Sequence, residues 1–217
     1  SIKSICEKLG VNRTGLISGY LNDLVQTNFV ARDFTWHFKK GEPSLLSKFR
    51  LSDNYLRFYL KYIEKNLPLI EQRSFQEKSL NNLNAWTAIL GLQFQNLVLH
   101  NRVHIRKLLG VSIEDMVIDN PYFQRATATH QGCQIDYIIQ TKLNNLFACE
   151  IKFSSREIGI GIIEEMEQKL TNLQLPKGFS CWPVLIHVNG VSDKVEDSNY
   201  FFKIIDFGEL LENQKFY

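Results

Sequence analysis

The feature that most constrains the fold is a pair of strand-like segments joined by a short polar turn. Residues 133–141 read Cys-Gln-Ile-Asp-Tyr-Ile-Ile-Gln-Thr, and residues 146–153 read Leu-Phe-Ala-Cys-Glu-Ile-Lys-Phe. Both segments are rich in β-branched and aromatic residues, and Asn144 and Asn145 stand between them, which is typical of a β-hairpin. Alternation along the first segment predicts that Ile135, Tyr137 and Ile139 share one face. We therefore expect a sheet built around this hairpin.

The segments around the hairpin predict a mixed α/β domain over residues 67–217. Helical periodicity precedes the hairpin, and a helix followed by a buried strand comes after it, so the order is helix, three strands, helix, strand. We expect an α-β-β-β-α-β (α+β) domain with a mixed sheet. The expected elements outside the hairpin are helices at 86–109 and 158–173, strands at 115–118, 122–129, 181–188 and 201–207, and a helical turn at 209–212.

The first 66 residues predict a separate, smaller domain. Two amphipathic helices flank a short turn, and two strands on either side of a Lys-Lys-Gly-Glu-Pro turn follow them, which is the plan of a winged helix-turn-helix. Its usual first helix is missing, so we expect the chain to start inside this domain. The expected elements are helices at 2–9 and 16–25, strands at 29–32 and 45–51, a helix at 54–66, and a connecting helix at 69–83 beyond Leu67-Pro68.

Charge is distributed unevenly along the 217 residues. Residues 1–66 hold 11 Lys and Arg against 6 Asp and Glu, whereas the rest of the chain holds 14 against 17. The basic N-terminal part is the better candidate to meet an anionic partner, with Arg13, Lys39 and Lys40 as candidate contacts to nucleic-acid phosphates. The alternative for these residues is a docking surface for a neighbouring protein domain.

Composition favours a cytoplasmic protein. No stretch of about 18 apolar residues is present, so we expect no membrane span, and the N-terminus lacks the apolar core of a signal peptide. The four cysteines form no Cys-x-x-Cys pair, which argues against a zinc site or a disulfide framework. The sequence does not indicate an oligomeric state.

Three charged residues stand out on the apolar hairpin. Glu150 and Lys152 share one face of their strand, and the turn brings Asp136 beside them. Hard cations such as Mg²⁺ or Mn²⁺ prefer oxygen ligands, so Asp136, Glu150 and the main-chain carbonyl of Ile151 are candidate metal ligands. A metal there would acidify a bound water, and Lys152 would orient that water or stabilise developing charge. The alternative is a cross-strand ladder of ion pairs.

Two other patterns favour ordinary structural roles. The aromatic residues of the 54–66 segment could stack bases, but their helical spacing favours a core between the two modules. His100 and His104 have the spacing of a helical zinc pair, yet neither the Glu of a metalloprotease motif nor a third ligand is evident.

An acidic residue, a hairpin and Glu-x-Lys on the next strand, behind a helix, together resemble the PD-(D/E)XK nuclease-like family. The winged helix and the segment 49–59, which reads Phe-Arg-Leu-Ser-Asp-Asn-Tyr-Leu-Arg-Phe-Tyr, extend the resemblance to the C-terminal half of a group of bacterial and archaeal AAA+ ATPases. It covers nearly the whole chain. It implies a restriction-endonuclease-like domain that uses Mg²⁺ or Mn²⁺, and it implies nucleic acid, an AAA+ ATPase domain or another protein as partner.

The resemblance also assigns roles to two further residues. Gln95 stands where the family usually has a glutamate on the first helix, so it keeps a carbonyl acceptor but lacks the negative charge. Lys169 matches a lysine often seen on the helix after the Glu-x-Lys strand. No Gly-x-x-x-x-Gly-Lys-Ser/Thr run exists, so no nucleotide site is expected within this chain.

The sequence therefore supports three hypotheses. The first is a nucleic-acid-directed module with a metal-dependent phosphodiesterase site formed by Asp136, Glu150, Lys152, Gln95 and Lys169, weakened by the glutamine. The second is a non-catalytic module of an AAA+ ATPase that docks on DNA or on a protein. The third is a transcription regulator that acts through the winged helix alone.

Overall fold

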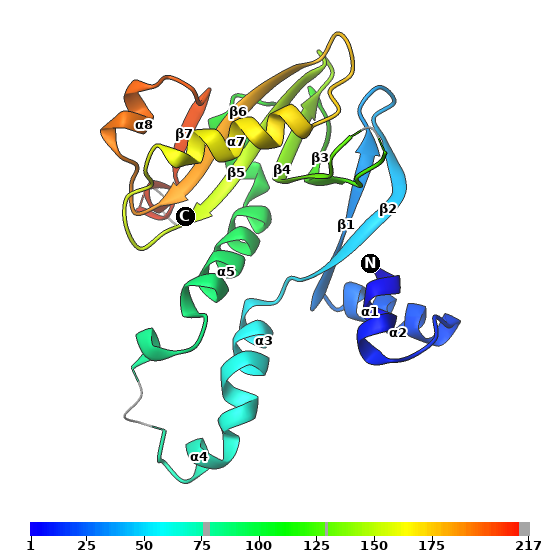
Figure 1. Cartoon of the computed structure of the whole chain (residues 1–217), viewed down its shortest axis with the longest axis vertical. Helices are drawn as coiled ribbons and strands as arrows, with labels where there is room; N and C mark the ends of the chain where they lie inside the picture. The colour runs from blue at the N-terminus through cyan, green and yellow to red at the C-terminus, as the bar shows by residue number, and fades with distance from the viewer. Residues whose placement is uncertain (76–78, 129, 213–217) are drawn as a thin grey trace. The chain divides into compact units, whose positions relative to one another are not determined.

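The computed structural model describes residues 1–75, 79–128 and 130–212. The chain forms two compact units, each assembled from two stretches of sequence, and each is described separately below (Figure 1). Unit 1 comprises residues 1–33 and 47–96, and unit 2 comprises residues 34–46 and 97–217. The division into domains at 1–66 and 67–217 stays a prediction.

Two short helices open unit 1, as the periodicity predicts. Helix α1 (Ile2–Leu9) ends at Gly10, whose φ of 66° lies in the left-handed region that glycine adopts without strain. Helix α2 (Gly15–Gln26) begins after Thr14, whose hydroxyl accepts a hydrogen bond from the backbone N–H of Ile17. The end of α1 and the start of α2 are thus set by local sequence.

A two-stranded antiparallel hairpin follows, formed by β1 (Val30–His37) and β2 (Glu42–Leu51). Its turn contains Lys39, Lys40 and Gly41. Gly41 has a φ of 66°, and a Cβ at this position would lie 2.6 Å from a methyl carbon of Val117, so a side chain fits here neither conformationally nor sterically. The order α1, α2, β1, β2 agrees with the predicted one, and its assignment as a winged helix stays a prediction.

The second half of unit 1 is helical but irregular. The predicted helix at 54–66 is present, with a π-helical turn inside it. Leu67-Pro68 begins a new helix and does not simply end the previous one, because proline is tolerated in a first helical turn. Residues 76–78 of the predicted connecting helix lie outside the described residues. The elements are α3 (Asn54–Phe58), η1 (Tyr59–Ile63), η2 (Glu64–Asn66), α4 (Leu67–Glu71), η3 (Leu80–Asn82) and the first part of α5 (Trp86–His100).

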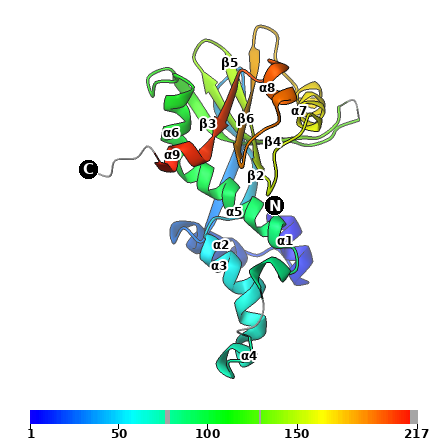
Figure 2. The same ribbon diagram turned by 90° about the vertical axis from the view of Figure 1, so that its left-hand side faces the viewer.

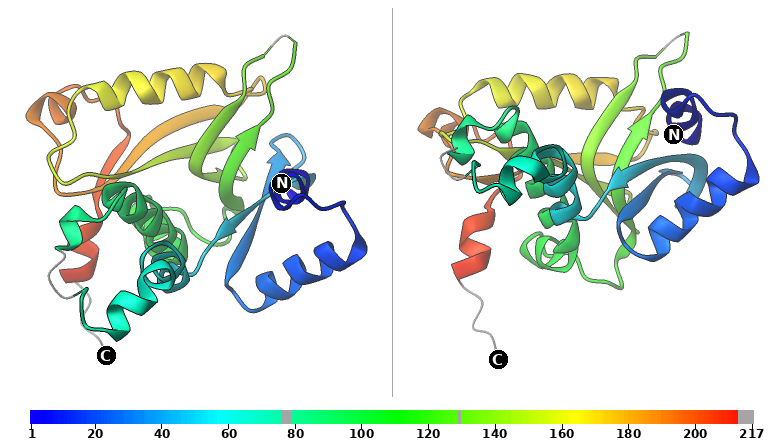
Figure 3. Two further views of the ribbon diagram at one scale, coloured as in Figure 1. Left: turned by 60° about the horizontal axis from the view of Figure 1, so that its bottom comes forward. Right: turned by 90° about the horizontal axis from the view of Figure 1, so that it is seen from below.

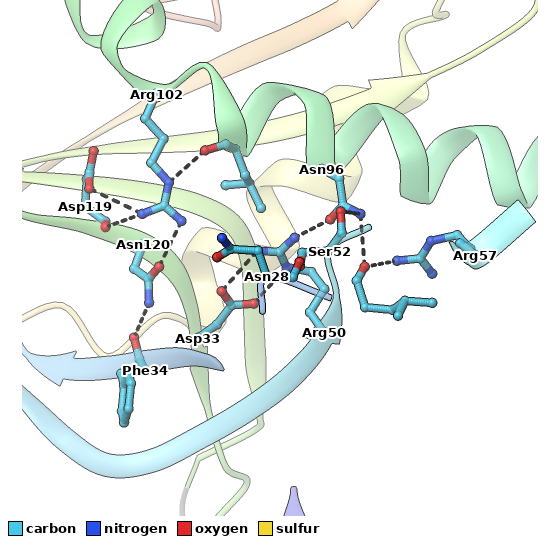
Figure 4. Close-up of polar contacts among 12 residues, drawn as sticks. Asn28, Asp33, Phe34, Arg50, Ser52, Arg57, Asn96, Arg102, Asp119 and Asn120 are labelled. Carbon is cyan, nitrogen blue, oxygen red and sulfur yellow. Dashed lines mark hydrogen bonds and ion pairs between the residues drawn. The ribbon is translucent and has the colours of Figure 1, made fainter. Parts of the chain in front are cut away.

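Aromatic and polar side chains hold unit 1 together. Phe58, Tyr62 and Trp86 pack against one another with ring centroids 5.6–6.2 Å apart, which places part of the predicted aromatic run in the core of this unit. Arg50 donates to Asp33 at 2.8 Å and also to Asn96, whose amide in turn donates to backbone carbonyls of the 51–52 segment (Figure 4). Hydrogen bonds thus compensate the buried guanidinium and carboxylate.

A five-stranded mixed sheet forms unit 2, in the order β3-β4-β5-β6-β7. Strand β4 is antiparallel to both of its neighbours, β3 and β5, whereas β5, β6 and β7 run parallel to one another. The mixed sheet is as predicted, because β5 and β6 are joined through a helix. The strands are β3 (Met116–Gln124), β4 (Cys133–Thr141), β5 (Asn145–Phe153), β6 (Ser180–Val188) and β7 (Lys203–Asp206).

Helices cover both faces of this sheet. Helices α7 (Gly161–Asn172) and α8 (Asp193–Asp197) lie on one side, and α6 (Arg102–Leu108) and α9 (Phe207–Glu212) lie on the other (Figure 2). Both views in Figure 3 show α7 running along its face of the sheet. Apolar residues of α7 and of the strands beneath it form one buried cluster, which includes Ile138, Ala148, Ile162, Met166 and Leu185. Among the described residues, no helix is long and apolar enough to cross a membrane.

Three expectations about helices between residues 86 and 197 differ from the structure. The helix expected at 86–109 breaks at Asn101 into α5 and α6. The helix expected from Ile158 begins at Gly161, since Ile158 forms a β-bridge with Val191. Helix α8 was not predicted, because five residues are too few for helical periodicity to register.

Candidate active site

A bulge in β4 lies at Asp136. Asn120 pairs with Ile138 and Tyr122 with Ile135, so two steps along β3 correspond to three steps along β4, and the extra residue lies at 136–137. Ile135 and Ile138 both belong to the cluster under α7. The prediction that Ile135 shares a face with Tyr137 and Ile139 is therefore wrong, because the bulge interrupts the alternation between them.

The register of β4 and β5 brings Asp136 beside Glu150. The last pair of this ladder is Tyr137 with Cys149, and the residues just beyond it, Asp136 and Glu150, are close enough for their carboxylates to interact electrostatically. The Glu150 side chain is only 5% exposed, whereas Asp136 is half-buried. The hairpin therefore brings the two carboxylates together, as the sequence predicts.

Backbone groups of Ile151 complete one side of this arrangement. The N–H of Ile151 donates to Oδ2 of Asp136 at 3.1 Å. In an extended strand the N–H and C=O of one residue point towards the same edge, so the carbonyl of Ile151 is also directed to the edge where Asp136 lies. Two carboxylates and one carbonyl oxygen, all hard donors, are thus grouped at the point where β4 and β5 separate.

Helix α7 supplies the counter-charges. The Nζ of Lys169 donates to Oε2 of Glu150, and the Nζ of Lys152 lies 2.5 Å from Oε2 of Glu165. Glu165 and Lys169 are four residues apart on the helix, about 6 Å along its axis. Glu150 and Lys152 are two residues apart on the strand, about 6.6 Å. The spacing of the two residues on the helix therefore matches the spacing of the two residues on the strand. As a result, Lys169 faces Glu150, and Glu165 faces Lys152.

These ion pairs change the sequence-based interpretation of the lysines. Lys152 is paired with a helix residue, and Lys169 is the lysine that contacts Glu150. A ladder of ion pairs is present, but it joins β5 to α7 and does not run across the hairpin. Glu165 was not predicted as a member of this cluster, although its spacing from Lys169 could have indicated it.

Burial dominates the electrostatics of the two carboxyl groups. It raises the pKa of Asp136, and Lys169 acts in the opposite direction. Burial likewise raises the pKa of Glu150, and the adjacent carboxylate of Asp136 raises it further. Burial by itself lowers the pKa of Lys169, but the neighbouring carboxylates, with Glu150 foremost, outweigh it, so the pKa of Lys169 is raised. The cluster thus keeps a cation close to two acids that are costly to ionise.

A cavity of about 350 Å³ opens beside Lys152, at the carboxyl end of β5 and the start of α7. The carboxyl ends of parallel strands are the usual place for ligands in α/β sheets. Polar and small residues make up most of its lining, which includes Lys152, Ser154, Glu157, Gly159, Gly161 and Glu165. The cavity gives solvent and small solutes a route towards this end of the charged cluster.

The other candidate residues occupy different parts of the chain. Gln95 lies on α5 within unit 1, so its predicted place beside the carboxylates stays a prediction. Arg13 is exposed in the loop between α1 and α2 of unit 1. Lys39 and Lys40 are exposed in the β1–β2 turn, which belongs to unit 2 and borders a cavity of about 360 Å³ that also contains Trp36, Phe38 and Tyr122.

A second charged group on the opposite side of β4 was missed by sequence reasoning. On β3, Oδ2 of Asp119 lies 2.5 Å from Nη1 of Arg106, and Oδ1 lies 3.5 Å from Nη1 of Arg102, both on α6. Oδ2 also accepts a hydrogen bond of 2.6 Å from the hydroxyl of Tyr137. Figure 4 shows Arg102, Asp119 and Asn120 of this group. Because Tyr137 follows Asp136 directly, its hydrogen bond to Asp119 holds the strand at the bulge.

The histidines and cysteines add no metal site. His100 ends α5, and His104 lies on α6 beyond the break, so the two are not on one continuous helix. Within the described ranges, no group of three or more His, Cys, Asp or Glu residues is arranged to hold a metal ion. All four cysteines are free thiols, and burial raises the pKa of Cys133 to about 11.

His187 on β6 provides a pH-dependent contribution to stability. It is 4% exposed, and its Nδ1 has no hydrogen-bond partner among the described residues. Burial lowers its pKa, which Asp206, Glu196 and Glu209 only partly offset. The unfolded chain therefore binds this proton more readily, and folding stability falls as pH drops below the unfolded pKa of about 6.5.

We expect substitution of His187 by leucine to remove this dependence. The loss of unfolding free energy between pH 7 and pH 5, measured by urea denaturation, should be smaller in His187→Leu than in the wild type. Substitution of the exposed His37 by leucine is the control and should leave the loss unchanged. An identical loss in the wild type and His187→Leu would show that His187 does not contribute.

Comparisons with known proteins do not identify a family for this chain. No family model matches the chain, and no curated protein matches it. A crystal structure of a repair endonuclease from Pyrococcus abyssi is similar to part of it, with 16% sequence identity and a TM-score of 0.34. The similarity covers 52% of this chain and 44% of that one. The structure itself shows a five-stranded mixed sheet with flanking helices.

Proposed function

We propose that this chain is a nucleic-acid-directed module with a metal-dependent phosphodiesterase site. The observation that carries the proposal is the pair of adjacent carboxylates, Asp136 and Glu150, set in a nearly apolar sheet next to the carbonyl of Ile151. Burying two acids together is costly unless a cation accompanies them. Their oxygen donors fit Mg²⁺ or Mn²⁺, which take one or two carboxylates and complete their shells with water and phosphate oxygens.

The residues of the cluster have distinct roles in this proposal. Asp136, Glu150 and the carbonyl of Ile151 hold the metal, which when bound acidifies a water and offsets charge on the phosphodiester. Asp136 is oriented by the N–H of Ile151. Lys152, at the mouth of the 350 Å³ cavity, positions the attacking water or the phosphate once it leaves Glu165. Gln95 is the proposed outer support of the site.

Basic residues outside the cluster supply the proposed contacts to nucleic acid. Lys39 and Lys40 are exposed in the β1–β2 turn, where flexible ammonium groups suit phosphate oxygens. Arg13, exposed between α1 and α2, would act in the same way if the N-terminal part is a winged helix. Such contacts predict binding that weakens steeply as the salt concentration rises.

We expect Glu150→Gln to reduce the rate of metal-dependent cleavage strongly. The full chain is incubated with Mg²⁺ or Mn²⁺ and with plasmid or single-stranded DNA, and the cleavage rate is measured on gels. Loss of a group that merely supports a metal ligand typically lowers activity about 10- to 100-fold, so loss of a ligand should lower the rate at least about 100-fold. Glu167→Gln, an exposed change of the same charge on α7, is the control and should retain the rate.

If cleavage is observed and Glu150→Gln cuts as fast as the wild type, the site assignment is wrong. If no cleavage occurs with any metal or substrate, the second candidate function gains support. That candidate is a non-catalytic module of an AAA+ ATPase that docks on DNA or on a protein. The observation that favours it is the pairing of both lysines with glutamates, which holds the charged groups in a closed arrangement.

A further inference from the structure

We infer that Lys169 is a built-in competitor for the metal: its ammonium group occupies the position beside Glu150 that a divalent cation would take, so metal binding requires Lys169 to leave. This inference rests on the proposed metal site. It concerns a different property, namely the affinity for the metal and the residue that sets it.

The contacts of Lys169 support this role. Its Nζ donates to Oε2 of Glu150, the carboxylate that is only 5% exposed. Electrostatic interactions with Asp136 and Glu165 also act on the same ammonium group. A single cationic atom therefore interacts with both proposed carboxylate ligands, which is the arrangement that a bound metal ion would have.

The anchoring of the helix explains why the ammonium is held there. The Sγ of Cys133 on β4 donates to the backbone carbonyl of Lys169 at 3.2 Å, and Met166, one turn earlier, is completely buried against the sheet. The backbone at Lys169 is thus fixed over the start of β4. The Lys169 side chain nevertheless remains 30% exposed, so rotation of its flexible stem can move the ammonium into solvent without moving the helix.

A charge argument gives the direction of the effect. With Lys169 on Glu150, the site offers a divalent ion two acids whose charge is already partly neutralised. Replacing the lysine by methionine, which has a similar unbranched length, removes the competing charge and keeps the packing of the stem. The metal then pairs with two carboxylates and does not have to displace a charge-assisted hydrogen bond.

The test is Mn²⁺ binding to the full chain, measured by calorimetry and by the shift in melting temperature on metal addition. We expect Lys169→Met to bind Mn²⁺ at least about tenfold more tightly than the wild type, which corresponds to about 1.4 kcal/mol. Lys169→Arg retains the charge and should stay as weak as the wild type. Lys177→Met removes an exposed positive charge beyond the end of α7 and should not change the affinity.

The outcomes separate this inference from the proposed function. If Lys169→Met binds Mn²⁺ more tightly and this binding disappears on adding Asp136→Asn, both the competitor role of Lys169 and the proposed metal site are supported. Equal affinities of the wild type and Lys169→Met, both abolished by Asp136→Asn, overturn the competitor role and leave the metal site intact. Absence of Mn²⁺ binding in both proteins overturns the metal site and the inference with it.

The variant is informative even if it folds poorly without metal. Lys169→Met leaves Glu150 buried without its partner, which is destabilising. A ligand that binds only the folded state raises stability in proportion to the logarithm of its concentration over its dissociation constant. Recovery of a cooperative melting transition on adding Mn²⁺, but not Na⁺ of equal ionic strength, supports the inference, and failure to recover with Mn²⁺ contradicts it.

Discussion

Asp119→Ala is expected to lower the free energy of unfolding by about 3–5 kcal/mol, because it leaves buried charges without their partner. The side chain of Asp119 is 10% exposed, and those of Arg102 and Arg106 are 28% and 13% exposed. Arg106 and Tyr137 would lose their acceptor, whereas Arg102 would keep its bonds to the carbonyls of Leu99 and residue 119 and to Asn120. The cost therefore exceeds that of an ordinary surface ion pair.

Urea denaturation followed by circular dichroism measures this loss. Asp115→Ala, at an exposed position four residues earlier, is the matched control and should cost less than about 1 kcal/mol. The loss of unfolding free energy in Asp119→Asn should lie between those of Asp119→Ala and Asp115→Ala, since asparagine keeps an acceptor but not the charge. If Asp119→Ala unfolds at the same urea concentration as the control, the network behind the bulge contributes little to stability.

Trp36→Ala is expected to lower the free energy of unfolding by a similar amount, about 3–5 kcal/mol, for a different reason. Trp36 is 2% exposed, and its ring packs edge-on against Phe38 and Tyr122 with centroids 5.8 and 5.1 Å away. Its indole N–H donates to Oε1 of Gln140 at 2.6 Å. Truncation therefore leaves a cavity and a buried amide oxygen without its donor.

A second tryptophan in the same unit provides the control. Trp182 on β6 is 43% exposed, donates a 3.4 Å hydrogen bond to Asn145 and has one ring contact, with Phe202 at 5.5 Å, among the described residues. Trp182→Ala should therefore cost less than half as much. Trp36→Phe should recover most of the packing but not the hydrogen bond to Gln140. If Trp36→Ala and Trp182→Ala melt at the same temperature, burial of Trp36 in this aromatic cluster is not what stabilises unit 2.

Local patterns predicted the hairpin and the pairing of its acids well. Residues 133–141 form a strand with the predicted bounds, and the hairpin with its Asn144 turn brings Asp136 near Glu150. These features depend on neighbouring residues alone. Alternation, turn residues and apolar runs are local properties, so a single sequence reveals them.

Features that depend on distant contacts were not predictable in the same way. The bulge at Asp136 follows from pairing with β3, and alternation within β4 gives no sign of it. The partner of Lys152 is a helix residue thirteen positions away, whose choice depends on how α7 lies over the sheet. Asp119 with its two arginines had no recognisable motif, because its partners are recruited from a helix broken at Asn101.

The mixed connectivity of the sheet also has a consequence for the order of folding. Strands β3, β4 and β5 form an antiparallel meander whose contacts are close in sequence, whereas β6 and β7 join only after long crossovers. Contacts of short sequence separation form first, since they require less loop closure. We therefore expect Asp136 and Glu150 to meet in an early intermediate that still lacks α7. In such a species the two acids would face water, and the ammonium would arrive only with the final docking step.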